Sequence, residues 1–311
     1  MKLYPTPENR LPEGGVCHDV TTTDGVHLRA FTARQTRAKA TLFILNGRAE
    51  YIERYFETIN DMVQRGFAVV SFDWRGQGGS QRQLSDAMRG YVKNFKNYDR
   101  DLEAIVGLAR RLDFPEPFYA MAHSTGGNIL LRALRDQRWF KRAVLCAPLL
   151  GLHFGKWPLP AVRVLTLGAK LLGLSWAYLP GYGRGPMKRA EFPNNPLTSD
   201  RVRWNRDMTT LEAHPELGVG GATYGWLRAV MQSLDALHKW PKSKGLTCPT
   251  MIVLAGQDRV VSNLEIRRFV ENTAGFTLLT IEGSRHEILM ENTTIRATFF
   301  AAFDSFMGLQ N

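Results

Sequence analysis

The chain has 311 residues, of which 44% are hydrophobic and 22% are charged, values typical of a globular protein. This composition excludes a disordered tail, a collagen-like fibre and a coiled coil, and the length suits one large α/β domain or two ordinary ones. Three widely spaced cysteines, Cys17, Cys146 and Cys248, do not form the pattern of a disulfide scaffold or a cysteine zinc site. The first residues lack the basic and apolar regions of a signal peptide, so the sequence predicts a cytoplasmic protein.

The net charge of +11 is distributed unevenly along the chain. No acidic residue occurs between Asp136 and Glu191, whereas nine basic residues do: Arg138, Lys141, Arg142, Lys156, Arg163, Lys170, Arg184, Lys188 and Arg189. Such a block favours an anionic partner, which could be a membrane surface, a nucleic acid or a charged substrate. The alternative interpretation is a solvated basic face that has no partner.

Short apolar runs alternate with amphipathic stretches along most of the chain. The first two runs, Gly15–Thr22 and Val26–Ala33, are predicted to form an antiparallel hairpin at the edge of a sheet. Buried strands are predicted at Ala40–Leu45, Phe67–Phe72, Phe118–Ala122, Ala143–Cys146, Thr250–Leu254 and Thr277–Ile281. Helices are predicted at Tyr51–Arg65, Asn97–Leu112, Gly126–Gln137, Asn263–Asn272 and Thr293–Phe306. This alternation predicts an α/β fold with a mostly parallel, doubly wound sheet.

The alternation stops from about Gly151 to Gly221, where no strand is predicted. A segment of this length is too long for a plain loop in a compact domain, so it should have structure of its own. We therefore predict an inserted helical cap over residues 151–221, and a core that combines residues 1–150 with residues 222–311.

Within the predicted cap, Ala161–Leu179 is an apolar stretch bounded by prolines. Arg163, Thr166 and Lys170 fall on one helical stripe of this stretch. Two cations inside a transmembrane helix would cost roughly 2.5–3.5 kcal/mol each, which disfavours a membrane span. Three interpretations are left: an interfacial amphipathic helix, a lid whose apolar face covers an active site, or a buried core helix.

The run Ala122-His123-Ser124-Thr125-Gly126-Gly127 follows a predicted strand and opens a predicted helix. This is the context of the G-x-S-x-G turn, in which a sharp bend exposes a nucleophilic serine above the sheet. Ala122 stands where the first glycine is usual, and its side chain is the smallest that carries a Cβ. The pattern therefore predicts Ser124 as a nucleophile.

A serine nucleophile needs a base, and the base needs an acid that orients it. In hydrolases of this architecture the acid and then the histidine follow the serine along the chain. Asp258 and His286 each come directly after a predicted strand, so both lie at the same edge of the sheet as Ser124. His214 and His238 lie in the cap or in a helix and lack this placement. The sequence therefore predicts a catalytic triad of Ser124, Asp258 and His286.

A tetrahedral intermediate also needs hydrogen-bond donors for its oxyanion. One predicted donor is the backbone N–H of Thr125, the residue after the nucleophile. The second is the backbone N–H of Arg48, in the loop after the first long strand, where Gly47 allows a sharp turn.

Several motifs together resemble the lysophospholipase and monoacylglycerol lipase group of α/β-hydrolases. They are Asn46-Gly47-Arg48 before a helix that contains Tyr55, the D-x-R-G-x-G-x-S run Asp73–Ser80, AHSTGG, AGQDRVV and GSRHE. The segments Asn195–Asp200 and Gly218–Tyr224, which begin in the predicted cap, resemble the bacterial lysophospholipase L2 branch more closely than the monoacylglycerol lipases. The resemblance implies a serine hydrolase that cleaves the carboxylic ester of a single-chain lipid, most specifically a lysophospholipid, without a metal or an organic cofactor.

Other functions are compatible with the same motifs. A monoacylglycerol lipase, a small-ester esterase or a proline-type aminopeptidase could use the same fold and triad. An aminopeptidase needs carboxylates that hold the substrate amine, for which Glu191, Asp200 and Glu212 are candidates. A non-catalytic protein that binds anions through its basic surface is a further alternative, but no nucleic-acid-binding motif accompanies the basic block. We instead expect the basic cap to contact the inner face of an anionic membrane.

Overall fold

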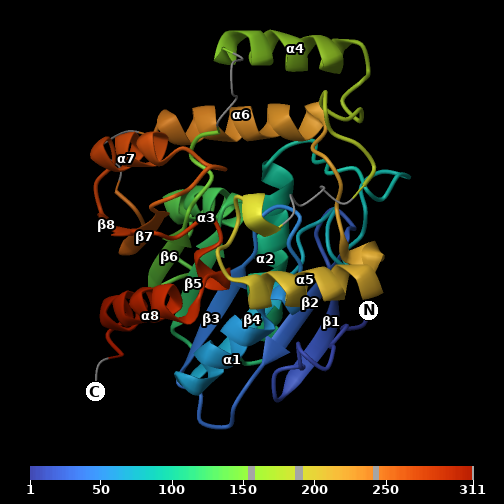
Figure 1. Ribbon diagram of the computed structural model, residues 1–311. Helices are drawn as coiled ribbons and strands as arrows, with labels where there is room; N and C mark the ends of the chain where they lie inside the picture. Colours follow the sequence, from blue (N-terminus) through green and yellow to red (C-terminus); the bar gives the residue numbers. More distant parts are fainter. Residues whose placement is uncertain (153–157, 186–191, 241–244, 310–311) are drawn as a thin grey trace.

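A computed structural model describes residues 1–152, 158–185, 192–240 and 245–309 of the chain (Figure 1). Eight strands form one sheet in the order β1-β2-β4-β3-β5-β6-β7-β8. All pairs from β4 to β8 are parallel, whereas β2 is antiparallel to both β1 and β4. The strands span Gly15–Thr21 (β1), His27–Ala33 (β2), Ala40–Leu45 (β3), Phe67–Phe72 (β4), Phe118–His123 (β5), Arg142–Cys146 (β6), Thr250–Ala255 (β7) and Phe276–Ile281 (β8). The predicted fold class and edge hairpin are confirmed.

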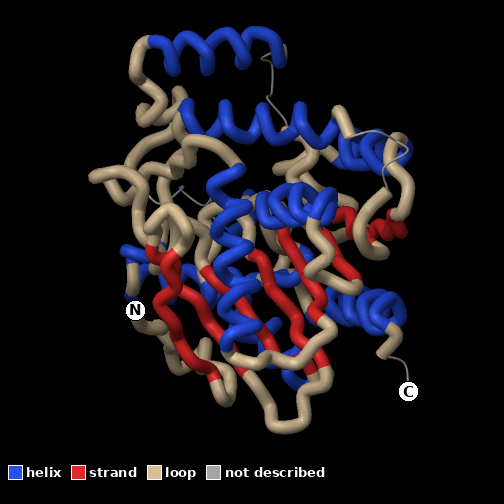
Figure 2. The backbone as a smooth tube through the Cα atoms, turned by 180° about the vertical axis from the view of Figure 1, so that it is seen from behind, coloured by secondary structure: helices blue, strands red, loops and turns tan. Residues whose placement is uncertain are grey.

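Helices cover both faces of the sheet. Helices α1 (Phe56–Gln64) and α8 (Thr293–Met307) lie on one face, and α2 (Lys96–Arg111) and α3 (Thr125–Asp136) lie on the other (Figures 1 and 2). Every residue of β4 and β7 is buried, because each of these central strands is covered from both sides. This burial explains why the strands appear in the sequence as uninterrupted apolar runs instead of alternating ones.

The predicted cap helix over Ala161–Leu179 is wrong in its length. Helix α4 spans Leu159–Leu171, and the chain turns where Gly173 adopts a φ of +73°. Glycine adopts this left-handed conformation without a Cβ clash, which makes it a common end for a helix. Tyr178 then forms a β-bridge with Thr223 instead of continuing the helix. In the described part of the chain, no helix is long and apolar enough to cross a bilayer.

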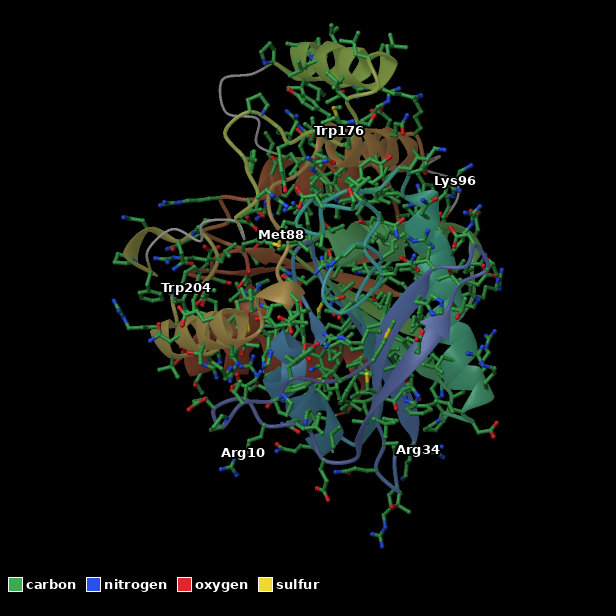
Figure 3. All side chains as sticks on the ribbon, turned by 90° about the vertical axis from the view of Figure 1, so that its right-hand side faces the viewer. Arg10, Arg34, Met88, Lys96, Trp176 and Trp204 are labelled. Atoms are coloured by element: carbon green, nitrogen blue, oxygen red, sulfur yellow. The ribbon has the colours of Figure 1, made fainter. Side chains whose placement is uncertain are left out.

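Helix α4 buries Val162, Thr166 and Ala169 and leaves most of its other apolar side chains exposed. Thr166 of the stripe is buried, and the Arg163 guanidinium binds the carboxylate of Asp235 with N–O distances of 2.5 and 2.7 Å. Val164, Leu171 and Leu172 are 72%, 77% and 75% exposed. Figure 1 shows α4 as the outermost helix, and Figure 3 shows its side chains projecting away from the body of the molecule. These exposed apolar side chains do not cover the sheet domain, so this side of α4 differs from what a lid or a buried core helix requires.

Asp235 belongs to helix α6 (Tyr224–His238), which the sequence analysis does not predict. Helix α6 lies directly beneath α4 in Figure 1 and contributes buried apolar residues to the same hydrophobic cluster as α2 and α3. Helix α7 (Asn263–Glu271) adds Ile266 and Phe269 to that cluster. In the sequence, the predicted boundary at Gly221 lies between α4 and α6, and these two helices pack on each other. The division into core and cap therefore stays a prediction.

Helix α5 (Arg201–Ala213) is attached to α1 by ionic contacts. The Glu57 carboxylate accepts hydrogen bonds from Arg203 at 2.5 and 2.9 Å and from Arg206 at 2.7 Å. Burial alone would raise the pKa of Glu57, but these bonds and the nearby charge of Arg296 outweigh burial and lower the pKa to about 2. The carboxylate is thus held in its ionised form by the fold.

We expect Glu57→Gln to lower the free energy of unfolding by about 1–3 kcal/mol at pH 7, after allowance for solvent screening. Because the folded-state pKa lies below the unfolded value of 4.5, the wild-type advantage is present above pH 4.5. It is lost as the pH falls from about 4.5 to about 2. Urea unfolding at a series of pH values measures this difference. The control is Glu103→Gln, an exposed substitution on α2; an equal loss in that variant contradicts the prediction.

Candidate active site

Ser124 lies at the turn between β5 and α3, with a φ of +50° that is uncommon for a residue with a side chain. The turn requires small neighbours, because a Cβ on Gly126 would collide with the carbonyl oxygens of Leu45 and Asn46. Ala122 fits at the other side as the paired residue between Leu45 of β3 and Leu145 of β6. Alanine in place of the usual glycine is therefore accommodated within regular strand pairing.

Asp258 and His286 meet at the same edge of the sheet, after β7 and β8 respectively. The Nδ1 atom of His286 lies 2.7 Å from Oδ2 of Asp258, and both side chains are buried. Oδ1 of Asp258 accepts hydrogen bonds from the backbone N–H groups of Val260 (2.8 Å) and Val261 (3.0 Å). Burial alone would raise the pKa of Asp258, but the hydrogen bonds from His286 and the backbone outweigh it and leave the pKa below its ordinary value. The carboxylate is therefore ionised at neutral pH.

Ser124 and His286 line one cavity of about 370 Å³. Its wall is apolar on several sides and carries a few charged groups. It includes Arg48, Ala49, Glu50, Arg54, Thr125, Leu149, Leu152, Tyr182, Leu197, Leu211, Gly218, Val219, Ala222, Trp226, Arg259, Val260, Val261 and Glu287. Among the described residues, no hydrogen bond joins the Ser124 hydroxyl to His286. Such a hydrogen bond is often long or poorly aligned in a free enzyme and tightens when substrate binds.

The loop that contains Arg48 is held by residues of the Asp73–Ser80 run. The Gln77 amide donates to the carbonyl oxygens of Gly47 (2.7 Å) and Glu50 (3.0 Å), and the Trp74 indole donates to the carbonyl of Asn46 (2.7 Å). The glycines of this run shape the chain, but its polar side chains bind the loop directly. Thr125 is the first residue of α3, so its N–H has no partner within the helix and is available to an anion.

A buried network of charged and polar side chains borders the cavity, and the sequence did not predict it. Oε1 of Glu50 lies 2.7 Å from Nδ1 of His123, while Oε2 accepts hydrogen bonds from Tyr55 and the N–H of Gly47. Burial lowers the pKa of His123, but the charge of Glu50 outweighs it and raises that pKa. Nε2 of His123 lies 3.1 Å from the carbonyl oxygen of His286. His123 thus connects the loop of Glu50 to the loop of the candidate base.

A second buried pair lies next to His286. Arg54 donates a hydrogen bond to Glu287 and lies 3.4 Å from Asp207 of α5. Glu287 follows His286, Glu50 lies two residues after Arg48, and His123 precedes Ser124. Closeness in the sequence to predicted site residues is therefore the signal that could have indicated this network.

The other candidate residues lie away from the cavity wall. The His214 ring lies 4.4 Å from the Tyr4 ring at a tilt of 46°, and His238 is hydrogen-bonded to the Leu150 carbonyl. Asp200 caps α5 through the N–H of Arg203, and Glu212 is exposed on the same helix. The predicted Lys156, Lys188, Arg189 and Glu191 lie outside the described residues.

An eight-stranded, mostly parallel sheet with a serine at a strained strand-to-helix turn defines an α/β-hydrolase. The chain belongs to the Hydrolase_4 family, described as serine aminopeptidase, S33, which matches residues 36–293.

Named relatives support this assignment. Lysophospholipase L2 of Escherichia coli strain K12 is 31% identical over 312 residues, which cover 94% of this chain and 87% of that protein. Monoglyceride lipase of Rattus norvegicus is 26% identical, with 81% of this chain and 77% of that protein covered. Among solved structures, a soluble variant of monoglyceride lipase from Saccharomyces cerevisiae in complex with a substrate analog has a TM-score of 0.72 at 18% identity, covering 98% of both chains. That structure is similar in fold.

Proposed function

We propose that the protein is a lysophospholipase that hydrolyses the carboxylic ester of a single-chain phospholipid. The main support for this proposal is that Ser124 and His286 line the same largely apolar cavity. Asp258 is hydrogen-bonded to Nδ1 of His286, which leaves Nε2 for Ser124. The 31% identity to a protein named lysophospholipase L2 supports this substrate class over others on the same fold.

The chemistry follows from the hydrogen-bonding capacities of the three side chains. Because Nδ1 of His286 donates to the Asp258 carboxylate, Nε2 carries the lone pair and acts as the base. His286 removes the proton of the Ser124 hydroxyl as its oxygen attacks the ester carbonyl. The backbone N–H groups of Arg48 and Thr125 stabilise the oxyanion. His286 then protonates the departing glycerophospho alkoxide, and a water activated by the same histidine releases the fatty acid from the acyl-enzyme.

The charges in the cavity favour an ester substrate over a peptide with a free amine. The carboxylates in the wall, Glu50 and Glu287, are each bound to a cationic or protonatable partner, His123 and Arg54. Neither presents an unneutralised charge to a substrate ammonium group. Monoacylglycerol hydrolysis is the second candidate, favoured by the apolar lining and by the monoglyceride lipase relative.

The test is the release of fatty acid from matched substrates by the purified protein. We expect 1-oleoyl-lysophosphatidylglycerol to give the highest kcat/KM in a panel that also contains 1-oleoylglycerol, p-nitrophenyl butyrate and proline p-nitroanilide. A higher value for 1-oleoylglycerol would establish a monoacylglycerol lipase, and a higher value for the anilide an aminopeptidase.

We also propose that the protein contacts membranes peripherally through α4. The supporting observation is its outward apolar face, formed by Val164, Leu171 and Leu172, which would be removed from water by partial insertion at the bilayer surface. The basic block contributes less charge to a membrane contact than the sequence suggests, because two of its cations have acidic neighbours. Arg163 is paired with Asp235, and Arg184 lies 3.3 Å from Asp86. Lys170 remains exposed on α4 and can face anionic lipid.

We expect replacement of Val164, Leu171 and Leu172 by Gln to weaken vesicle binding by about 10-fold or more, because three apolar side chains are lost from the contact. Co-sedimentation with vesicles of phosphatidylcholine and phosphatidylglycerol measures this effect. Raising the salt concentration should weaken wild-type binding only in part, since screening acts on the charges alone. The matched control is Val202→Gln, at a valine that is 76% exposed on α5. Equal binding of wild type and the triple variant would exclude α4 as the contact.

A further inference from the structure

We propose that the Arg48 side chain binds the phosphate group of the substrate and thereby sets the preference for a phosphorylated over a neutral head group. This inference rests on the proposed lysophospholipase function and assigns the part of the cavity that recognises the head group.

The order of strands separates the cavity into two sides around Ser124. Strand β5, which carries Ser124, lies between β3 on one side and β6 and β7 on the other. Arg48 follows β3, whereas the apolar wall residues Leu149, Leu152, Val260 and Val261 follow β6 and β7. Leu152 and Val261 are joined by a β-bridge, so this apolar side is continuous. An ester held at Ser124 can therefore direct its acyl chain toward β6 and β7 and its head group toward Arg48.

The Arg48 guanidinium is held in place by its surroundings. Nη2 donates a 2.7 Å hydrogen bond to the carbonyl of Gly220, and the guanidinium carbon lies 5.0 Å from the centre of the Trp226 ring. On another side the group packs so closely on Gly90 that any Cβ there would collide with it. A guanidinium has five N–H donors in a planar fork that matches two oxygens of a phosphate. Little conformational entropy is lost on binding when such a group is already fixed.

The position of Arg48 also fits the length of the substrate. Its backbone N–H is the proposed oxyanion donor, so in this arrangement the main chain of Arg48 lies next to the ester carbonyl and its guanidinium is one side-chain length from it. In a lysophospholipid only the glycerol unit separates that ester from the phosphate, a span that an extended arginine side chain also covers. The nearby carboxylate of Glu50 is engaged by His123, Tyr55 and the N–H of Gly47, so it is not an uncompensated charge facing the phosphate.

The experiment compares two substrates that share an acyl chain and a glycerol ester. The measured quantity is the ratio of kcat/KM for 1-oleoyl-lysophosphatidylglycerol to kcat/KM for 1-oleoylglycerol. Arg48→Met retains a long side chain against Trp226 and the backbone N–H but removes the charge. We expect the ratio to fall by about 10- to 100-fold, the effect of losing a hydrogen-bonded charge partner. Arg48→Lys retains the charge without the fork, and we expect a smaller fall of about 3- to 10-fold.

Arg259→Gln is the matched control. Arg259 lines the same cavity but follows β7, on the proposed acyl side, and its removal should change the ratio less than about 3-fold. The proposal is overturned if Arg48→Met lowers kcat/KM for both substrates by the same factor, because Arg48 would then only support the loop. A fall in the ratio for Arg259→Gln that matches or exceeds that for Arg48→Met also overturns it. If Arg48→Met fails to fold, Arg48→Lys tests the proposal instead. A purely structural role of Arg48 would leave the ratio of the two kcat/KM values unchanged in Arg48→Lys, and that result would overturn the proposal.

The proposed function can fail independently of this inference. If the wild type cleaves 1-oleoylglycerol but no lysophospholipid, the lysophospholipase proposal is wrong. Inhibition of p-nitrophenyl butyrate hydrolysis by glycerol 3-phosphate then still tests Arg48. We expect Arg48→Met to raise the inhibition constant by about 10-fold or more, with Arg259→Gln near the wild-type value. No wild-type inhibition, or equal inhibition of wild type and Arg48→Met, would show that Arg48 does not bind phosphate.

Discussion

Ser124→Ala should lower ester turnover by roughly 10⁴- to 10⁶-fold, because the acyl-enzyme can no longer form. The remaining activity would come from binding and from the oxyanion donors, whose backbone N–H groups the substitution retains. The variant should also lose covalent labelling by a fluorophosphonate probe. Initial rates with p-nitrophenyl butyrate and gel-based labelling measure the two effects.

The control for this substitution is Ser305→Ala, at an exposed serine on α8. It should leave both turnover and labelling at wild-type levels. Persistent labelling of Ser124→Ala, with its circular dichroism spectrum unchanged, would mean that another residue is the nucleophile.

Asp258→Asn should lower kcat by up to about 10⁴-fold while the fold is retained. In the wild type the ionised carboxylate accepts the Nδ1 proton of His286 at 2.7 Å. An amide at this position can donate its own hydrogen to Nδ1 and so favour the tautomer in which Nε2 carries the proton and cannot act as a base. Single-turnover kinetics with a chromogenic ester separate this loss of chemistry from a loss of binding.

Glu282→Gln is the appropriate control, because Glu282 is exposed beside the same loop. It should reduce kcat by less than about 3-fold, as a surface substitution away from the reacting atoms. Glu287 is unsuitable as a control, since its removal would leave the buried Arg54 without its strongest partner and destabilise the fold. An equal loss in Glu282→Gln and Asp258→Asn would refute the assignment of Asp258 as the acid.

The positions of the predicted triad residues followed from chain order and strand ends. A nucleophile turn needs a buried strand before it and small residues after it, and both features are local. Asp258 and His286 each follow an apolar strand, and parallel strands bring their carboxyl ends to one edge. The distance between Asp258 and His286 then required the tertiary structure, because it depends on how β7 and β8 pair and on two loops.

The supporting network was not predictable in the same way. Glu50 and His123 are 73 residues apart, and Arg54 and Glu287 are 233 residues apart. Each is an ordinary charged or polar residue when it is considered alone. They form a buried network only because the loops after β3, β5 and β8 lie close together at one edge of the sheet. No local sequence pattern indicates that these loops are neighbours.

The sequence by itself determined the elements with a strong local cause: apolar runs that form central strands, amphipathic stretches that form the flanking helices, and the small residues around Ser124. Only the tertiary structure decided the surroundings of the basic block. Residues 137–190 contain no acid, but Asp235 and Asp86 reach Arg163 and Arg184 from other parts of the chain. It also decided which side of α4 is buried. Periodicity divides a helix into two sides, but only the packing partner, here α6, determines which side turns inward.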